Sequence, residues 1–147
     1  MKILHILPEL QIGGVERHVI DLANELTARG HETMVVSAGG RMEEQLDKGV
    51  RILHLPVHKK NPFMGYYCAR QIVRVVREQK FEIIHAHSRV PAWIAMWASR
   101  MSGVPYVVTA HSVFNTQARW IYKPYREAAK TICVSETVRQ QMKDCFY

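Results

Sequence analysis

The sequence predicts a doubly wound parallel α/β sheet, folded as a single domain of three layers with helices on both faces of the sheet. Six short apolar runs recur along the chain, and helical patterns separate most of them. Alternation of strand and helix is typical of βαβ units, in which the strands run parallel and the helices cover both faces. The chain of 147 residues is long enough for one domain with its own core.

The expected strands span residues 3–7, 33–37, 51–55, 83–87, 106–110 and 131–134. Between the first two of these strands, Val19, Leu22, Ala23 and Leu26 recur at the spacing of one helical stripe. Gly30 follows that stripe as a C-cap. The first crossover is therefore expected to be an amphipathic helix.

Three further helices are expected. One lies near residues 64–80 and repeats the apolar stripe. The next, over residues 91–101, opens with a proline and ends before Gly103, and it is apolar nearly all round, which is typical of a deeply packed helix. The last begins after Ser135, a good N-cap residue, and runs to the end of the sequence.

A glycine-containing loop connects the first strand to the first helix. Gly13 and Gly14 stand where that helix begins. A helix start exposes unpaired backbone N–H groups at the positive end of the helix dipole, and glycine lets a phosphate approach the backbone closely. The loop is either a phosphate-binding site or simply a tight turn.

Polar residues follow the expected strands, and in an open α/β sheet ligands bind beyond the carboxyl ends of the strands. These residues are Glu16 after the first strand, His85, His87 and Arg89 around the fourth, His111 after the fifth, and Ser135 and Glu136 after the sixth. Their common position predicts a polar crevice at one edge of the sheet.

The histidines allow two interpretations. His85 and His87 share one face of a strand, and with His111 on the neighbouring strand they could hold zinc. No acidic or thiol ligand accompanies them, and a buried, hydrogen-bonded histidine is the commoner outcome, so we expect no metal site. His111, at the tip of its strand, either donates to a substrate oxygen or caps the following turn.

Basic residues gather near the second helix. Arg70, Arg74 and Arg77 lie along one edge of it, and Lys59 and Lys60 precede it. With a net charge of +7, this edge could rest on an anionic membrane surface. The alternative is an ordinary solvated helix face.

Several function classes fit poorly. The glycines lack the full G-x-G-x-x-G spacing, and the ribose-binding acid expected where the second strand ends is missing, although Arg41 there could suit a 2′-phosphate. A nucleotide- or NADP-binding domain without transferase activity therefore remains an alternative. The sequence has neither a P-loop nor a nucleophile elbow. It also has no recognised nucleic-acid motif, so we expect no nucleic-acid partner.

The expected location is cytoplasmic, with peripheral attachment to the inner face of a membrane. Three cysteines without metal-like spacing suggest a reducing compartment. The N-terminus leads straight into a strand, so no signal peptide is expected. The longest apolar stretch, residues 91–98, is too short to span a bilayer.

Taken together, the motifs resemble the N-terminal domain of a GT-B fold glycosyltransferase of the large retaining class called family 4. The motifs that carry the resemblance lie at residues 13–16, 22–23, 30–32, 83–88, 103–111 and 132–136. This family has two Rossmann-like domains, and the N-terminal one binds the acceptor and closes over the donor phosphates. The resemblance implies a sugar transfer from a nucleotide-sugar to the hydroxyl of a glycolipid, polysaccharide or other cell-envelope glycan, with no permanently bound cofactor and no metal requirement.

Residue roles follow from the same resemblance. Gly13 and Gly14 would bind the donor diphosphate, and His111 would contact the transferred sugar. The acceptor side of the cleft would be lined by Glu16, His87, Arg89, Ser135 and Glu136.

The family's E-x7-E signature belongs to a C-terminal donor-binding domain that residues 1–147 do not include. We therefore expect a fragment, truncated before the last strand of its domain, that is inactive alone. The second alternative is a module that only binds anionic membranes through its basic helix.

Overall fold

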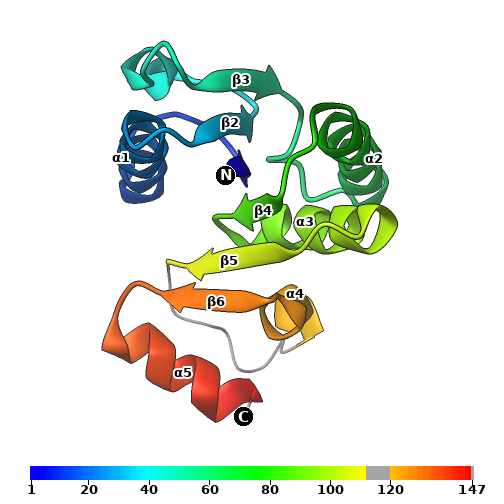
Figure 1. The fold of residues 1–147 in the computed structure, drawn as a ribbon. Coiled ribbons are helices and arrows are strands. Elements are labelled where there is room, and N and C mark those ends of the chain that lie inside the picture. Colours follow the sequence, from blue (N-terminus) through cyan, green and yellow to red (C-terminus); the bar gives the residue numbers. More distant parts are fainter. Residues whose placement is uncertain (112–119, 147) are drawn as a thin grey trace.

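The computed structural model describes residues 1–111 and 120–146, which form a six-stranded parallel sheet in the order β3-β2-β1-β4-β5-β6 (Figure 1). The strands are β1 (Lys2–Ile6), β2 (Glu32–Ser37), β3 (Arg51–His54), β4 (Ile83–Ala86), β5 (Tyr106–Ala110) and β6 (Lys130–Cys133). Every neighbouring pair runs parallel. The predicted fold class is confirmed. No strand begins or ends more than one residue away from its predicted boundary.

The helices are α1 (Gly14–Ala28), the 3-10 helix η1 (Arg41–Gln45), α2 (Pro62–Gln79), α3 (Arg89–Ser102), α4 (Lys123–Glu127) and α5 (Glu136–Phe146). The short helices η1 and α4 lie where the sequence patterns predicted no element. Within the described residues, no helix combines the length and the apolar character needed to cross a bilayer.

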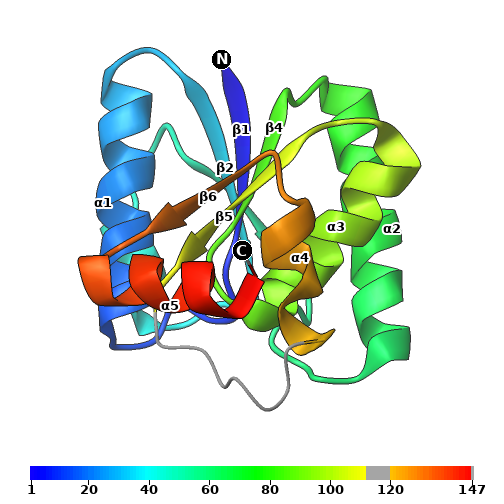
Figure 2. The ribbon, with the colours of Figure 1, turned by 90° about the horizontal axis from the view of Figure 1, so that it is seen from below.

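Helices lie on both sides of the sheet. α1 lies on one side, and α2, α3 and α4 lie on the other (Figure 2). Alternate residues of β1 serve the two layers: Leu4 and Ile6 belong to the larger apolar cluster under α2 and α3, whereas His5 faces the side of α1. Leu7, just after β1, packs in a smaller cluster with Val19 and Ile20 of α1.

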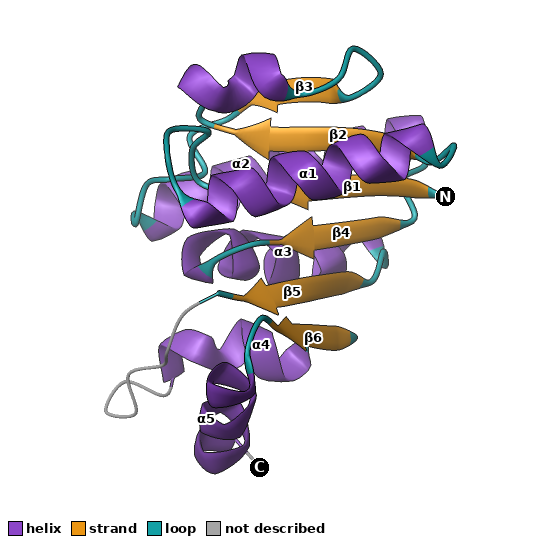
Figure 3. Ribbon diagram, turned by 90° about the vertical axis from the view of Figure 1, so that its left-hand side faces the viewer, coloured by secondary structure: helices purple, strands orange, loops and turns teal. Residues whose placement is uncertain are grey.

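The α1 side of the sheet is only partly covered. α1 lies over the β1 and β2 region, and no described helix stands over β5 on that side (Figure 3). Ile132 in β6 and Val134 just after it are 47% and 48% exposed. The uncovered part of this face is continuous with the carboxyl ends of β4 and β5.

Local signals explain where α2 and α5 begin. Asn61 caps α2, because its Oδ1 accepts a hydrogen bond from the Phe63 N–H at 2.9 Å, and Pro62 occupies the first helical position. The predicted cap of the last helix is confirmed: Ser135 Oγ accepts a hydrogen bond from the Val138 N–H at 3.2 Å.

The loop after β1 is fastened to the loop after β2. The Leu10 N–H donates to Gly39 O at 2.9 Å, and the Met42 N–H donates to Leu10 O at 2.7 Å. Gly40 has φ +152°, and a Cβ there would collide with the backbone of Leu10. Because this approach needs glycine, Gly40 holds in place the segment that leads to Gly13.

Gly40→Ala should lower the free energy of unfolding by about 1–3 kcal/mol, since the new methyl group strains this backbone. Urea denaturation followed by circular dichroism measures the change. The matched control is Gly14→Ala, because a Cβ on Gly14 would meet no described atom within 4 Å. Equal stability of the two variants would show that the two loops are not held together in this way.

Candidate functional site

A cavity of about 470 Å³ lies at the carboxyl edge of the sheet. Its lining includes Pro8 and Val15 from the β1–α1 segment, Arg89 at the start of α3, and His111 just after β5. β1 and β4 are neighbours in the middle of the sheet, and the helices that follow them lie on opposite sides. The cavity therefore lies where the strand order reverses, the usual ligand site of an open parallel sheet.

The N-terminus of α1 forms one side of this region. Gly13 is the N-cap and Gly14 the first helical residue, and none of the described side chains caps this helix. A Cβ on Gly14 would meet open space within the described chain. The start of α1 therefore lacks a side-chain cap from the described residues, and the helix dipole favours negative charge there.

A carboxylate already lies over this helix start. The side chain of Glu16, in the first turn of α1, folds back so that a Cβ on Gly13 would collide with it. A negative group here is stabilised by the helix dipole, by about 0.3–1 kcal/mol. A phosphate arriving at Gly13 would need the Glu16 side chain to move aside.

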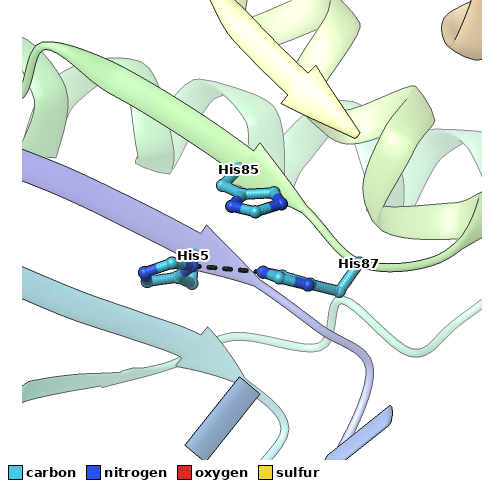
Figure 4. A group of neighbouring side chains, drawn as sticks. All are labelled: His5, His85 and His87. Atoms are coloured by element: carbon cyan, nitrogen blue, oxygen red, sulfur yellow. Dashed lines mark hydrogen bonds between the residues drawn. The ribbon is translucent and has the colours of Figure 1, made fainter. Parts of the chain in front are cut away.

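Beneath the cavity lies a group of buried histidines. His5 of β1 and His87, just after β4, share a hydrogen bond between His5 Nδ1 and His87 Nε2 at 3.1 Å (Figure 4). The ring of His85 stacks on that of His87 with centroids 4.0 Å apart. His85 Nε2 also contacts Thr109 Oγ1 at 2.7 Å.

Two more imidazoles lie above them. His18 is exposed on α1, with its ring centroid 5.0 Å from that of His111 and 6.0 Å from that of His87. The centroids of His87 and His111 are also 6.0 Å apart. We name His5, His18, His85, His87 and His111 the histidine cluster.

Burial keeps most of this cluster uncharged. Desolvation, assisted by the nearby His85 and His18, lowers the pKa of His5 to about 3. Burial and His18 lower the pKa of both His85 and His111 to about 4. The pKa of His87 lies well below its usual range, chiefly because of burial. At neutral pH these rings are hydrogen-bonding groups rather than cations.

His5 and His18 were not among the site residues predicted from the sequence. His5 lies between two core residues of an apolar strand, which hides it in the pattern. His18 stands four residues after Gly14, one helical turn beyond the predicted anion site, and that spacing could have identified it.

The other predicted residues are divided between the cavity and its surroundings. Arg89 and His111 line it, whereas His87 is fully buried beneath it. Ser135 and Glu136 are not among its lining residues. The Ser135 hydroxyl caps α5, and Glu136 pairs with Arg139 at 2.8 Å.

The predicted basic residues lie at the surface. Lys59 and Lys60 are exposed before α2, and Lys60 also lines the cavity. Arg70, Arg74 and Arg77 line one surface hollow along α2. Within the described part of the chain, Arg74 lies 3.7 Å from a carboxylate oxygen of Glu78, and Arg77 donates to Met101 O at 2.5 Å.

Exposed aromatic residues, which the sequence analysis did not identify, precede these arginines on α2. Phe63 is 86% exposed, and Tyr66 and Tyr67 are each 49% exposed. Phe63, Tyr67, Arg70 and Arg74 follow one another at spacings of three and four residues, so they share one side of the helix. We name Phe63, Tyr66, Tyr67, Arg70, Arg74 and Arg77 the α2 outer face.

An apolar groove of about 320 Å³ adjoins the cavity. Trp93, Ile94 and Trp97 of α3 form part of its wall. Lys60 and Arg89 line both the groove and the cavity, so the two are neighbours. A polar site and an apolar groove thus share a basic rim.

Comparison with known proteins shows the family of this chain. The model of a family described as Glycosyltransferase Family 4 matches residues 12–147. Among curated relatives, the GPI3 subunit of phosphatidylinositol N-acetylglucosaminyltransferase from Saccharomyces cerevisiae is 23% identical over 148 residues, covering 90% of this chain and 33% of the relative. A phosphatidyl-myo-inositol mannosyltransferase from Mycolicibacterium smegmatis is 25% identical, covering 87% of this chain and 36% of the relative.

Solved structures agree. A glycosyltransferase from Rickettsia africae superposes with a TM-score of 0.81 at 28% identity, covering 96% of this chain and 38% of that one. An Anabaena protein solved in complex with UDP-glucose shares the fold, with a TM-score of 0.77 at 17% identity, covering 99% of this chain and 41% of that one. The chain thus spans about a third of the length of the curated relatives it matches.

Lowering the pH should destabilise the fold. The pKa of His5 is about 3 in the folded chain against an ordinary value of 6.5. Below pH 6.5 the unfolded chain therefore binds a proton that the folded chain does not bind. The free energy of unfolding consequently decreases as the pH is lowered. Each such histidine should cost about 2 kcal/mol of unfolding free energy between pH 6.5 and pH 5.

Urea denaturation at pH 7 and pH 5 measures this loss. His5→Gln should reduce the pH dependence, whereas His31→Ala, outside the cluster beside the N-terminus, should leave it unchanged. Equal stability at the two pH values would mean that the buried imidazoles become protonated without penalty.

Proposed function

Because the chain belongs to Glycosyltransferase Family 4, we propose that it is the acceptor-side half of an enzyme that transfers a sugar from a nucleotide-sugar to an acceptor hydroxyl, with retention of configuration. The observation that carries the proposal is the uncapped glycine start of α1 beside a cavity whose wall includes His111. In this proposal Gly13 and Gly14 donate backbone N–H groups to the diphosphate. The remaining donor contacts come from a second domain.

His111 suits a role beside the transferred sugar. Among the described residues its Nε2 has no hydrogen-bond partner, although that atom is buried. Its lowered pKa keeps the ring neutral, so one nitrogen can donate to a sugar oxygen while the other accepts. A neutral donor placed at the reacting centre stabilises charge that develops as the diphosphate leaves.

The acceptor is proposed to be a lipid-linked or other cell-envelope glycan. Its polar end would occupy the cavity near Arg89, and an apolar part would lie in the groove formed by Trp93 and Trp97. The relatives named for phosphatidylinositol and phosphatidyl-myo-inositol support an acceptor of this amphiphilic type. Lys60, on the shared rim, would attract an anionic headgroup.

We further propose that the protein is cytoplasmic and rests on the inner face of a membrane through the α2 outer face. Aromatic side chains favour the membrane–water interface, and each basic side chain near an anionic surface contributes about 1 kcal/mol. Phe63 would enter the interface while the arginines of α2 contact lipid phosphates. This orientation would present the apolar groove, which includes Pro62 beside Phe63, toward lipid-borne acceptors.

In a two-domain protein containing this chain, His111→Ala should lower turnover by about a hundredfold, the typical cost of losing one such hydrogen-bond donor. Initial rates with a nucleotide-sugar measure the effect, and the unfolding transition checks that the variant folds. His31→Ala, outside the cavity, should keep normal turnover. Near-normal turnover of a folded His111→Ala variant would contradict the role beside the sugar and would favour the alternative in which His111 only caps the following turn.

Vesicle co-sedimentation tests the membrane proposal. Binding should appear with anionic lipid at low salt, disappear with neutral lipid, and fall when Arg70, Arg74 and Arg77 are changed to glutamate. The matched control changes three exposed basic residues elsewhere, Arg29, Lys48 and Lys143, to glutamate, which alters the net charge equally. Equal loss in both triple variants would indicate net charge rather than a defined membrane face.

A further inference from the structure

The apolar groove beside the cavity gathers all the tryptophans of the chain. The sequence contains three tryptophans, and Trp93, Trp97 and Trp120 all line this groove. Trp93 and Trp97 lie on α3 with ring centroids 5.7 Å apart, and Trp120 is 73% exposed. An aromatic wall of this size, partly in contact with solvent, is typical of a surface that binds a ligand.

The wall of the groove offers few free hydrogen-bonding groups. The Trp93 indole N–H donates to Ile121 O at 2.8 Å. Asn61 Oδ1 accepts the hydrogen bond from Phe63 N–H that caps α2. Most of the other uncharged lining residues are aliphatic or aromatic. Because a buried hydroxyl without a hydrogen-bond partner is costly, this wall suits a hydrocarbon chain better than a sugar ring.

The charged part of the lining is basic. Lys60 and Arg89 line both the groove and the cavity, and among the described residues no aspartate or glutamate lines either one. Arg89 is half-buried. Within residues 1–111 and 120–146, neither Arg89 nor Lys60 forms an ion pair with a carboxylate. A guanidinium that is partly removed from water without a counter-ion is stabilised by an anion.

The start of α3 adds a polar group beside Arg89. Ser88 is the N-cap residue of α3 and lines the cavity, and within the described chain its side chain makes no capping hydrogen bond. The Ser88 hydroxyl could therefore donate to a phosphate. The positive end of the α3 dipole favours a negative charge at the same place.

Gly65 leaves room in the groove between α2 and α3. This residue is buried in α2 and lines the groove. A Cβ there would lie 3.1 Å from a ring carbon of Trp97 and 3.8 Å from a side-chain carbon of Ile94. A larger side chain at this position would therefore occupy space beside the Trp97 ring that a ligand could otherwise fill.

We propose that the groove binds one hydrocarbon chain of a lipid phosphate, and that the phosphate binds Lys60 and Arg89 on the shared rim. This inference rests on the proposed function and names the acceptor class more narrowly, as a molecule in which a phosphate joins the polar end to a hydrocarbon chain. The guanidinium of Arg89 and the ammonium of Lys60 both suit phosphate oxygens. Because the basic rim adjoins the apolar wall, one amphiphilic molecule can contact both.

Intrinsic fluorescence of the 147-residue chain tests the proposal, because all three tryptophans line the groove. Hexyl, octyl and decyl phosphate, each below its critical micelle concentration, should shift the emission. Their affinity should rise about fourfold for each CH₂ group that enters the groove. Inorganic phosphate should cause no shift, and decyl maltoside, which is uncharged, should bind about tenfold more weakly than decyl phosphate.

Two pairs of variants separate the contribution of the chain from that of the phosphate. Gly65→Val should abolish the gain in affinity with chain length, whereas Gln71→Val, on the same helix but outside the groove lining, should keep it. Arg89→Gln should weaken the binding of all three alkyl phosphates about tenfold without changing the gain for each CH₂ group. Lys48→Gln, which removes one exposed charge elsewhere, should leave the affinities unchanged.

An affinity that does not depend on chain length, or equal binding of decyl maltoside and decyl phosphate, would overturn the proposal. A normal gain with chain length in a folded Gly65→Val variant would also overturn it. Thermal unfolding checks that the variant is folded, and the ligand series with the unchanged chain decides the matter if it is not.

No nucleotide-sugar takes part in these measurements, so the two proposals can fail separately. If the alkyl phosphates bind as expected but a two-domain protein containing this chain transfers no sugar, the proposed function fails and the lipid-phosphate site stands. If sugar transfer occurs but the alkyl phosphates do not bind, the lipid-phosphate site alone is overturned.

Discussion

The parallel alignment of all six strands is the constraint on which the site depends. Because every strand points the same way, every strand end and every following helix start lies at one edge of the sheet. β1 lies between β2 and β4, and the helices that follow β1 and β4 cover opposite sides. This edge therefore carries a helix N-terminus, two strand tips and a cavity, although their residues are far apart in sequence.

The histidine cluster sets the chemistry below that edge. Imidazoles placed this close together cannot all carry charge, and burial makes the neutral form the stable one. The net positive charge of the chain consequently resides in lysines and arginines at the surface, and the cavity floor is polar but uncharged. Surface lysines and arginines would attract anionic groups, and hydrogen bonds from the uncharged cavity floor would then orient them.

Much of this arrangement was predictable from sequence, for identifiable reasons. The buried strands and the stripes of α1 and α2 follow from apolar periodicity, and Ser135 was identified as a cap because its residue type suits that position. The helices η1 and α4 were missed because five residues are too few for a period to emerge. Contacts between strands, such as the His5–His87 hydrogen bond, require the strand order, which local patterns do not contain.

The absence of strand order from local patterns also explains why some predicted site residues lie outside the cavity. Ser135 and Glu136 follow a strand as predicted, yet β6 is the edge strand, so they lie outside the cavity lining. The aliphatic stripe of α2 was predicted and is buried, but the opposite side was considered only for its basic residues, so its exposed aromatic side chains were not identified. Which of the predicted residues lie together in one site depends on which strands are neighbours in the sheet, and not on position along the chain.

In the proposed enzyme, the glycine start of α1 binds the phosphates of a nucleotide-sugar. Nuclear magnetic resonance of the ¹⁵N-labelled chain during titration with inorganic pyrophosphate tests it most directly. We expect saturable shifts of the Gly13 and Gly14 amide signals, accompanied by shifts at Glu16 as its carboxylate leaves the helix start. Shifts confined to the basic residues of α2, with the Gly13 and Gly14 signals unmoved, would contradict it.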